Sequence, residues 1–510
     1  MKVLNKSADL PAVKHALTNT VTRQLVKVEK LTNVLYASVN EFYTNEIDKK
    51  YVESSQLDSK ILLHSKRDPN STAVREFTLS KEKLDHVVKP FQKNNRFILD
   101  KIINKLINKK NPRRHLEIVL GTILLNYPID KADAKFPKRV EISETLRPMY
   151  QSALVSLLMD KILAAGFQFK TPYLAQLLAG YSEWDVEHKN TALIQLQKLF
   201  VEIIHLREMG LHSPQSQEIL SRAGQNNLLD EQNRQELHVQ SKLNAKEFHH
   251  YGIGGLEVRA DYTAAQELAA QRMNVRDADG KLYEEAEIKK WQESQAQNIS
   301  KLEHIAEHLA YKQHTARFAF IKDVLDPQSK KGVEGVEIEA LLKVCQVYCS
   351  FILSVKTNVD LELHIKAYDM MHKQAQEKLI DGYFTEQLLL MMGRFPIGSG
   401  LYFTDLRRNN NDYGTIDKAI VIGINPVSVD EPIVRRVTTN YKYRIGSDYG
   451  TVARIANLYF PEARKPKRFT EKLQIRFKTQ FRTDNDDDVL FSFRANDAFR
   501  TLSISETKLW

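Results

Sequence analysis

Two histidines, His205 and His238, are the residues of this sequence whose type and spacing first suggest chemistry. His205 lies near the end of an apolar stretch that is predicted to be a helix over residues 190–209, and His238 lies in a second predicted helix. Between them, Gly210 and a polar loop are typical of a turn. A helix, a turn and a second helix can bring two imidazoles together in one helical core, where they could bind a metal ion.

A second group of such residues is His304, Glu307 and His308, in the spacing H-x-x-E-H. On a helix this spacing places two imidazoles on one face beside a glutamate base, as in inverted zinc proteases. That class uses a further glutamate ligand in a much longer, two-lobed chain. With 15 histidines in a helix-rich sequence the pattern can arise by chance, so we do not predict metalloprotease chemistry.

The elements that would position these histidines are helices. Apolar residues recur at helical spacing over residues 13–42 and 91–107, and the pattern becomes dense from Ile142 onward. The sequence therefore predicts a mainly α fold, with a helical region over residues 1–140 and a helical domain over residues 141–400.

The order of segments within that domain resembles one known family. IIHLREMGLHSP, EILSRAG and LLDEQNRQELH follow one another around His205 and His238, and LIDGYFTEQLLLMMGRFPIGSGLYF occupies residues 379–403. From Ile142 to Val437 this order resembles the HD-GYP family, the cyclic-di-GMP phosphodiesterase branch of the HD-domain phosphohydrolases. The resemblance implies an HD-like helical bundle and a bacterial signalling role.

The resemblance also implies that most metal ligands have been lost. Of the family's histidines, His205, His238 and His314 remain. The following residues stand where the family has other functional groups: Leu206 for the aspartate of the His-Asp doublet, Met209 for a lysine, Tyr150 or Gln151 for the first histidine, and Gln346 for a later aspartate. A carboxylate that bridges two cations is needed to generate a metal-bound hydroxide, and leucine cannot replace it.

We therefore predict no catalytic residues, no bound metal and no cofactor, and a catalytically inactive HD-GYP-like regulator or scaffold. A cyclic dinucleotide or a protein is the expected partner. One alternative is an active metal-dependent phosphodiesterase with an atypical site. Its candidate ligands are His205, His238, His304, His308 and His314.

Composition places the chain in a broad class. It has 510 residues, 42% of them hydrophobic and 27% charged, which is typical of a globular protein. The two cysteines, Cys345 and Cys349, are four residues apart on a predicted helix, which does not suit a disulfide framework and indicates a reducing compartment. No apolar run approaches the length of a membrane span and no signal sequence is recognised, so we expect a cytoplasmic protein without membrane contact.

The last part of the chain, residues 401–510, changes character. Alternating segments at 472–478 and 489–494 predict strands. Half of the chain's net charge of +10 lies in this last fifth of its length. Arg464 to Arg468 (RKPKR) stands beside aromatic residues, a mixture that nucleic-acid sites use. This basic, β-rich C-terminal region gives the second alternative, a nucleic-acid-binding protein.

Two smaller features of the sequence are explained by local structure without a binding site. Basic residues near a predicted helix stop, Lys109, Lys110, Arg113 and Arg114, fit a solvated turn better than an anion site. The glycines of 252–255 are predicted to form a loop, because neither flank is a clear strand that a phosphate-binding turn would need.

Overall fold

Helices dominate the structure of this chain, which is a computed structural model. It describes residues 4–5, 17–107, 112–128, 135–224, 229–254, 315–327, 333–356, 362–405, 415–437, 449–465, 471 and 474–475. The mainly α fold that the periodicity predicts is confirmed. Among these residues, no helix is long and apolar enough to cross a membrane.

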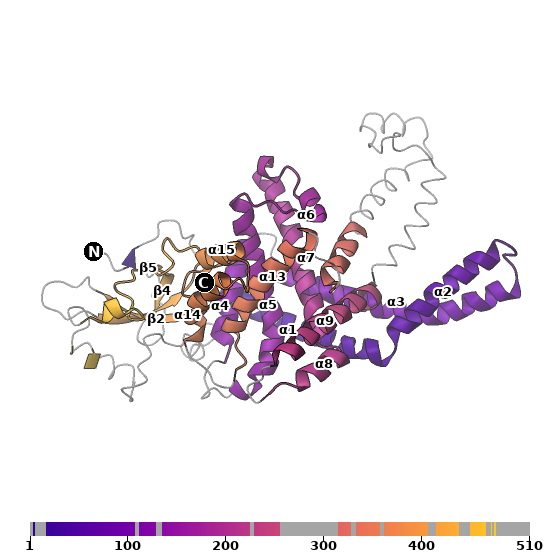
Figure 1. The fold of residues 1–510 in the computed structure, drawn as a ribbon, viewed down its shortest axis with the longest axis horizontal. Coiled ribbons are helices and arrows are strands. Elements are labelled where there is room, and N and C mark those ends of the chain that lie inside the picture. Colours follow the sequence, from indigo (N-terminus) through magenta and orange to yellow (C-terminus); the bar gives the residue numbers. More distant parts are fainter. Residues whose placement is uncertain are drawn as a thin grey trace.

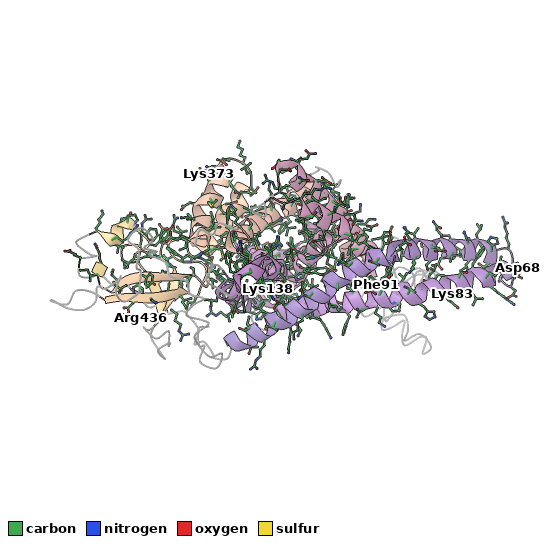
Figure 2. The ribbon with its side chains drawn as sticks, turned by 90° about the horizontal axis from the view of Figure 1, so that it is seen from below. Asp68, Lys83, Phe91, Lys138, Lys373 and Arg436 are labelled. Carbon is green, nitrogen blue, oxygen red and sulfur yellow. The ribbon has the colours of Figure 1, made fainter. Side chains whose placement is uncertain are left out.

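Four helices make up the first part of the chain: α1 (Leu17–Thr44), α2 (Ile47–Ser65), α3 (Thr72–Leu106) and α4 (Pro112–Asn126). α2 and the first half of α3 form an antiparallel hairpin that projects from the helical body (Figure 1). Asp68 lies at its tip, and the second half of α3 continues past Phe91 into the body (Figure 2). This second half carries the buried face of α3, which includes Leu99 and Ile102.

The body continues with six elements: η1 (Phe136–Lys138), α5 (Arg139–Ala164), α6 (Pro172–Leu177), η2 (Tyr181–Glu183), α7 (Val186–Leu211) and α8 (Pro214–Ser221). Next come α9 (Glu231–Glu247) and the π-helix η3 (Phe248–Gly254). Residues 315–325 are helical. The last helices are α13 (Val333–Ile352), α14 (Leu363–Gln376) and α15 (Gly382–Met392).

Side-chain caps explain where several of these helices begin. Asp185 accepts a hydrogen bond from the His188 amide at 2.8 Å, and Asp230 accepts one from the Asn233 amide at 2.7 Å. Asp381 caps α15 in the same way. Each cap satisfies one of the backbone N–H groups that a helix leaves unpaired at its N-terminus.

α7 and α9 cross at unusually short range, and Gly210 makes this crossing possible. A Cβ atom at Gly210 would lie 2.0 Å from the carbonyl oxygen of Ser241 and 2.9 Å from the Cβ of Ala245. A side chain here would therefore push the two helices apart. The glycine that the sequence suggests as a helix break lies inside α7 and serves helix packing instead.

A small antiparallel sheet stands at the end of the body away from the hairpin (Figure 1). Its strand order is β1 (Leu4–Asn5), β5 (Tyr449–Val452), β4 (Ile433–Val437), β3 (Thr415–Val421) and β2 (Gly400–Asp405). β2 pairs with β3 in a register that places Gly400 opposite Ile420. The sheet covers a small apolar core of its own, which includes Phe395, Leu401 and Phe403.

One continuous apolar core joins the rest of the molecule. It includes Val28 of α1, Leu99 of α3, Leu154 of α5, Ile203 of α7 and Leu341 of α13. The first helices of the chain therefore share a core with the helices that carry His205 and Gln346.

Two local predictions are wrong. Gln474 and Ile475 are helical, whereas the alternation at 472–478 predicts a strand. A short apolar run fits both periods, because Leu473 and Phe477 are also one helical turn apart. The other predicted strand, 489–494, lies outside the described residues.

The second error concerns the glycines after Tyr251. Gly252 and Gly254 belong to the π-helix η3, not to a loop. Amide groups of α3 stabilise it: Gln92 donates to the carbonyl oxygen of Tyr251 at 2.8 Å, and Asn95 donates to that of Gly252 at 3.2 Å. Carbonyl oxygens, not N–H groups, therefore face α3 here, and Gly255 lies outside the described residues.

Candidate functional site

His205 lies on the core face of α7 and is only 2% exposed. Its Nδ1 is 2.9 Å from the carbonyl oxygen of Val201, one turn earlier on the same helix. Burial lowers the pKa of His205 to about 4, so its imidazole is neutral at neutral pH. The Nε2 atom is buried without a hydrogen-bond partner in the described part of the chain. This histidine is a core residue with one free ring nitrogen.

The other face of α7 opens onto a cavity of about 840 Å³. Arg207 stands two residues after His205, which is a rotation of roughly 200° around a helix of 3.6 residues per turn, and it lines this cavity. The walls come from α7, α9, α13, helical residues 315–325 and the turn between α14 and α15. The volume lies within the range of pockets that hold small organic ligands or cofactors.

α9 contributes a row of basic side chains at intervals of one turn. His238 and Lys242 line the cavity, and Lys246 follows four residues later. Partial burial, Lys242 and Arg207 together lower the pKa of His238, because its neighbours exclude water and carry positive charge. His238 is therefore a neutral hydrogen-bonding group at neutral pH.

Glu339 on α13 holds two of the cavity's cations. Its carboxylate lies 2.9 Å from Nζ of Lys242 and accepts two hydrogen bonds of 3.4 Å from the guanidinium of Arg207. Burial acts to raise the pKa of Glu339, but Arg207 and Lys242 outweigh it and keep that pKa below its ordinary value. Glu339 is thus ionised, and these three charges form one compact network.

The remaining acidic groups of the cavity are mostly engaged as well. Asp326 pairs with Lys246, and Asp381 accepts the capping hydrogen bond from the Phe384 amide at 2.9 Å. The side-chain carboxylate of Asp323 lines the cavity without an ion-pair or hydrogen-bond partner in the described part of the chain. It is the one carboxylate of this wall with no internal engagement there.

The side-chain ammonium groups of two lysines of the cavity, Lys343 and Lys378, have no ion-pair or hydrogen-bond partner within the described ranges. Lys343 stands one helical turn after Glu339 on α13. Lys378 lies in the turn that follows α14 and has a left-handed backbone, with φ of 58°. The whole lining carries four Lys or Arg side chains and four Asp or Glu side chains. Among those without a side-chain partner, two ammonium groups stand against one carboxylate, and this local excess of positive charge favours an anionic group.

The left-handed backbone of Lys378 follows from the way α14 ends. The amide of Lys378 donates to the carbonyl of Ala375 at 3.0 Å, and the amide of Leu379 donates to that of Gln374 at 2.9 Å. This pair of hydrogen bonds is the Schellman motif, in which glycine is the usual residue at the left-handed position. A lysine here costs backbone free energy, and its side chain lines the cavity.

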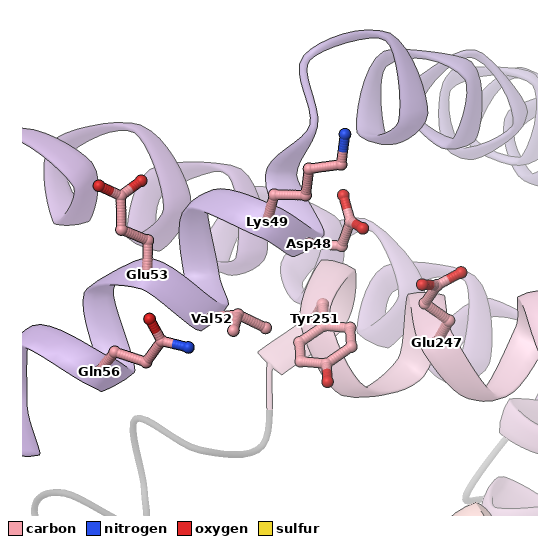
Figure 3. A pocket seen from close by; sticks show the side chains of 7 residues that line it. All are labelled: Asp48, Lys49, Val52, Glu53, Gln56, Glu247 and Tyr251. Atoms are coloured by element: carbon pink, nitrogen blue, oxygen red, sulfur yellow. The ribbon is translucent and has the colours of Figure 1, made fainter.

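A second, smaller cavity of about 320 Å³ lies where the projecting hairpin meets η3 (Figure 3). Asp48, Glu53 and Glu247 line it together with Tyr251. Glu247 accepts a hydrogen bond of 3.1 Å from the hydroxyl of Tyr43. Burial raises the pKa of Glu247, with smaller effects from its neighbours.

His205 and His238, which the family pattern groups together, lie in different surroundings. His238 and Gln346 line the large cavity, whereas His205 is not among its lining residues. Apart from Gln346, the residues that stand at lost functional positions are buried: Leu206, Met209, Tyr150 and Gln151. Gln151 donates to the carbonyl of Leu342 on α13 at 3.4 Å. His304, His308 and His314 lie outside the described residues.

No group of three or more histidine, cysteine, aspartate or glutamate side chains within the described ranges is arranged to hold a metal ion. Cys345 and Cys349 are free, buried thiols. Burial raises the pKa of the Cys349 thiol to about 12. It is therefore protonated at neutral pH.

The basic clusters of the sequence are only partly described. Arg114 donates to Glu117 at 2.8 Å and to the carbonyl of Ile422 at 3.2 Å, so it links α4 to the sheet region. Lys109 and Lys110 lie outside the described residues. Arg464 ends the 3-10 helix η4 (Pro461–Arg464) and is followed by Lys465, whereas residues 466–468 are not described.

The sequence interpretation missed the residues that matter most in this cavity: Arg207, Lys242, Glu339 and Lys343. Two signals could have indicated them. His238 and Lys242 are spaced by four, and Glu339 and Lys343 are spaced by four, so each pair shares one helix face. Neither spacing shows that this face of α9 meets this face of α13 in the fold.

Comparison of the chain with family models, with curated proteins and with solved structures finds no match.

Proposed function

We propose that this chain is a catalytically inactive, HD-GYP-like regulatory or scaffold protein of the bacterial cytoplasm, whose large cavity binds a phosphate-bearing ligand. A cyclic dinucleotide is the first candidate. The observation that carries the proposal is the pair of unengaged lysines, Lys343 and Lys378, on the wall of an 840 Å³ cavity. Ammonium groups are common ligands of phosphate oxygens in proteins.

The cavity also offers neutral groups that a nucleotide can use. His238 and Gln346 can donate or accept hydrogen bonds. Val347 and Leu379 supply apolar surface on the same wall. Small-ligand pockets combine such apolar surface with a few polar groups that orient the ligand.

We propose binding without hydrolysis because this chain lacks carboxylates at positions where the family pattern has them. Leu206 is fully buried beside His205, and Gln346 stands where the pattern has an aspartate. Neither side chain can bridge two cations or help to generate hydroxide. The Nδ1–H group of His205 donates to the carbonyl oxygen of Val201 on its own helix.

One experiment tests binding and catalysis on the same sample. The full chain is purified anaerobically, its metal content is quantified, and cyclic di-GMP binding and hydrolysis are measured with Mn²⁺, Fe²⁺ or Mg²⁺ supplied. We expect saturable binding and no turnover above background. Turnover that disappears in His205→Ala would establish the alternative, an active metal-dependent phosphodiesterase.

A further inference from the structure

Arg207 and Lys242 form a second pair of cations in the large cavity, and this pair already holds an anionic group. The carboxylate of Glu339 lies 2.9 Å from Lys242 and 3.4 Å from two nitrogens of Arg207. Lys242 is 7% exposed. A guanidinium and a buried ammonium that converge on one carboxylate have the arrangement of a phosphate- or carboxylate-binding site.

The position of Glu339 connects this pair to the unengaged lysines. Glu339 and Lys343 stand one turn apart on the same face of α13, and both line the cavity. An anionic ligand held by Lys343 therefore lies beside the carboxylate of Glu339 and is repelled by it. If the carboxylate of Glu339 moves away from Arg207 and Lys242, the same ligand can contact these two cations as well.

We propose that Arg207 and Lys242 are a second phosphate subsite of the cavity, which the carboxylate of Glu339 fills in the unliganded chain. This inference rests on the proposed function in one respect, namely that the cavity takes a phosphate-bearing ligand. The ligand must displace the carboxylate of Glu339 before it can contact Arg207 and Lys242. The unmodified chain should therefore bind the ligand more weakly than it would if all four cations of the cavity were free to contact it.

The test is a double-mutant cycle on the full chain. Glu339→Gln keeps the size of the side chain but removes the competing charge. Inorganic pyrophosphate and cyclic di-GMP are titrated separately into the unmodified chain, Glu339→Gln, Lys242→Gln and the double variant. Glu386→Gln is the charge-matched control, since Glu386 is exposed on α15 and does not line the cavity.

We expect Glu339→Gln to strengthen pyrophosphate binding roughly tenfold, the usual size of one charge-assisted hydrogen bond. Lys242→Gln alone should change the affinity little, because Lys242 is engaged by Glu339. In the Glu339→Gln background the same lysine substitution should remove the gain. A purely structural Glu339 would not produce this coupling between the two positions.

The outcomes separate the subsite from the proposed function. A gain with pyrophosphate that Lys242→Gln removes supports the subsite even if cyclic di-GMP does not bind. Equal affinities in all variants, or a gain that Lys242→Gln leaves intact, overturn the subsite while leaving ligand binding in place. If Glu339→Gln does not fold, Glu339→Asp withdraws the carboxylate by one methylene and should show a smaller gain of the same sign.

Discussion

His205 and Arg207, two residues apart on α7, serve opposite faces of that helix. The imidazole of His205 is buried and contacts the Val201 carbonyl at 2.9 Å, whereas Arg207 lines the large cavity and pairs with Glu339. The helix thus separates the histidine that the sequence marks for metal chemistry from the charges of the cavity. Stability should depend on the first residue and ligand binding on the second.

The first prediction concerns pH and stability. The folded chain lowers the pKa of His205 from 6.5 to about 4. Between these values the unfolded chain binds more protons, so the free energy of unfolding rises with pH there and is lost as pH falls. His205 alone should account for about 2 kcal/mol between pH 7.5 and pH 5.

Urea unfolding of the unmodified chain and of His205→Gln at both pH values measures this contribution. The variant should lose about 2 kcal/mol less on acidification, because glutamine does not titrate. Equal losses in the two proteins would show that His205 does not carry the proton linkage. His212, whose pKa burial also lowers to about 4, remains in both proteins and therefore cancels.

The second prediction concerns the ion pairs of Glu202, which is 1% exposed on α7. Its carboxylate lies 3.2 Å from Arg96 of α3 and also pairs with Arg317. Glu202→Gln removes the buried counter-charge of Arg317 and leaves Arg96 with only the more exposed Asp100 at 3.5 Å. It should cost roughly 3 kcal/mol in the free energy of unfolding. Glu187→Gln, an exposed change on the same helix, should cost only a few tenths. Equal, small effects in chemical denaturation would refute the buried-pair account.

The third prediction concerns backbone strain at Lys378, whose φ is 58°. Lys378→Gly should raise the free energy of unfolding by about 1 kcal/mol, because glycine adopts the left-handed backbone without steric cost. The same substitution at Lys373 inside α14 should lower it by about 1 kcal/mol. Lys378→Gly should also weaken cyclic di-GMP binding. A variant that is less stable, or binds as well as the unmodified chain, would contradict a functional reason for lysine here.

The fourth prediction belongs to the nucleic-acid alternative. If the basic segment RKPKR binds phosphates, replacing Arg464, Lys465, Lys467 and Arg468 by Gln should weaken binding to single-stranded RNA or DNA, with little change in melting temperature. Raising salt from about 50 to 200 mM should weaken binding of the unmodified chain. An early-melting variant would indicate a structural cluster. Unchanged binding with an unchanged salt response would remove this alternative.

The sequence was informative where local periodicity decides structure. Apolar residues at helical spacing predicted the helices that became α5, α7 and α13. These features depend on neighbours a few residues apart, which a single sequence contains.

The cavity was not predictable in the same way, because it depends on which helix faces meet. Lys242 and Glu339 are almost a hundred residues apart, and nothing in either segment indicates the 2.9 Å contact between them. Lys378 gave no signal either, since its left-handed backbone replaces the glycine that usually marks such a turn. His205 attracted attention by residue type, yet its helix turns it into the core.

The most direct measurement is the dissociation constant of cyclic di-GMP for the unmodified chain, for Lys343→Gln and for Lys83→Gln. Lys83 lies on the projecting part of α3 (Figure 2), away from the residues that line the cavity. Lys343→Gln loses one charge-assisted hydrogen bond to the ligand, so we expect it to bind cyclic di-GMP roughly tenfold more weakly than the unmodified chain. The affinity of this variant should also depend less on salt. Lys83→Gln should bind as the unmodified chain does. No saturable binding to the unmodified chain, or the same affinity in all three proteins, would contradict the account.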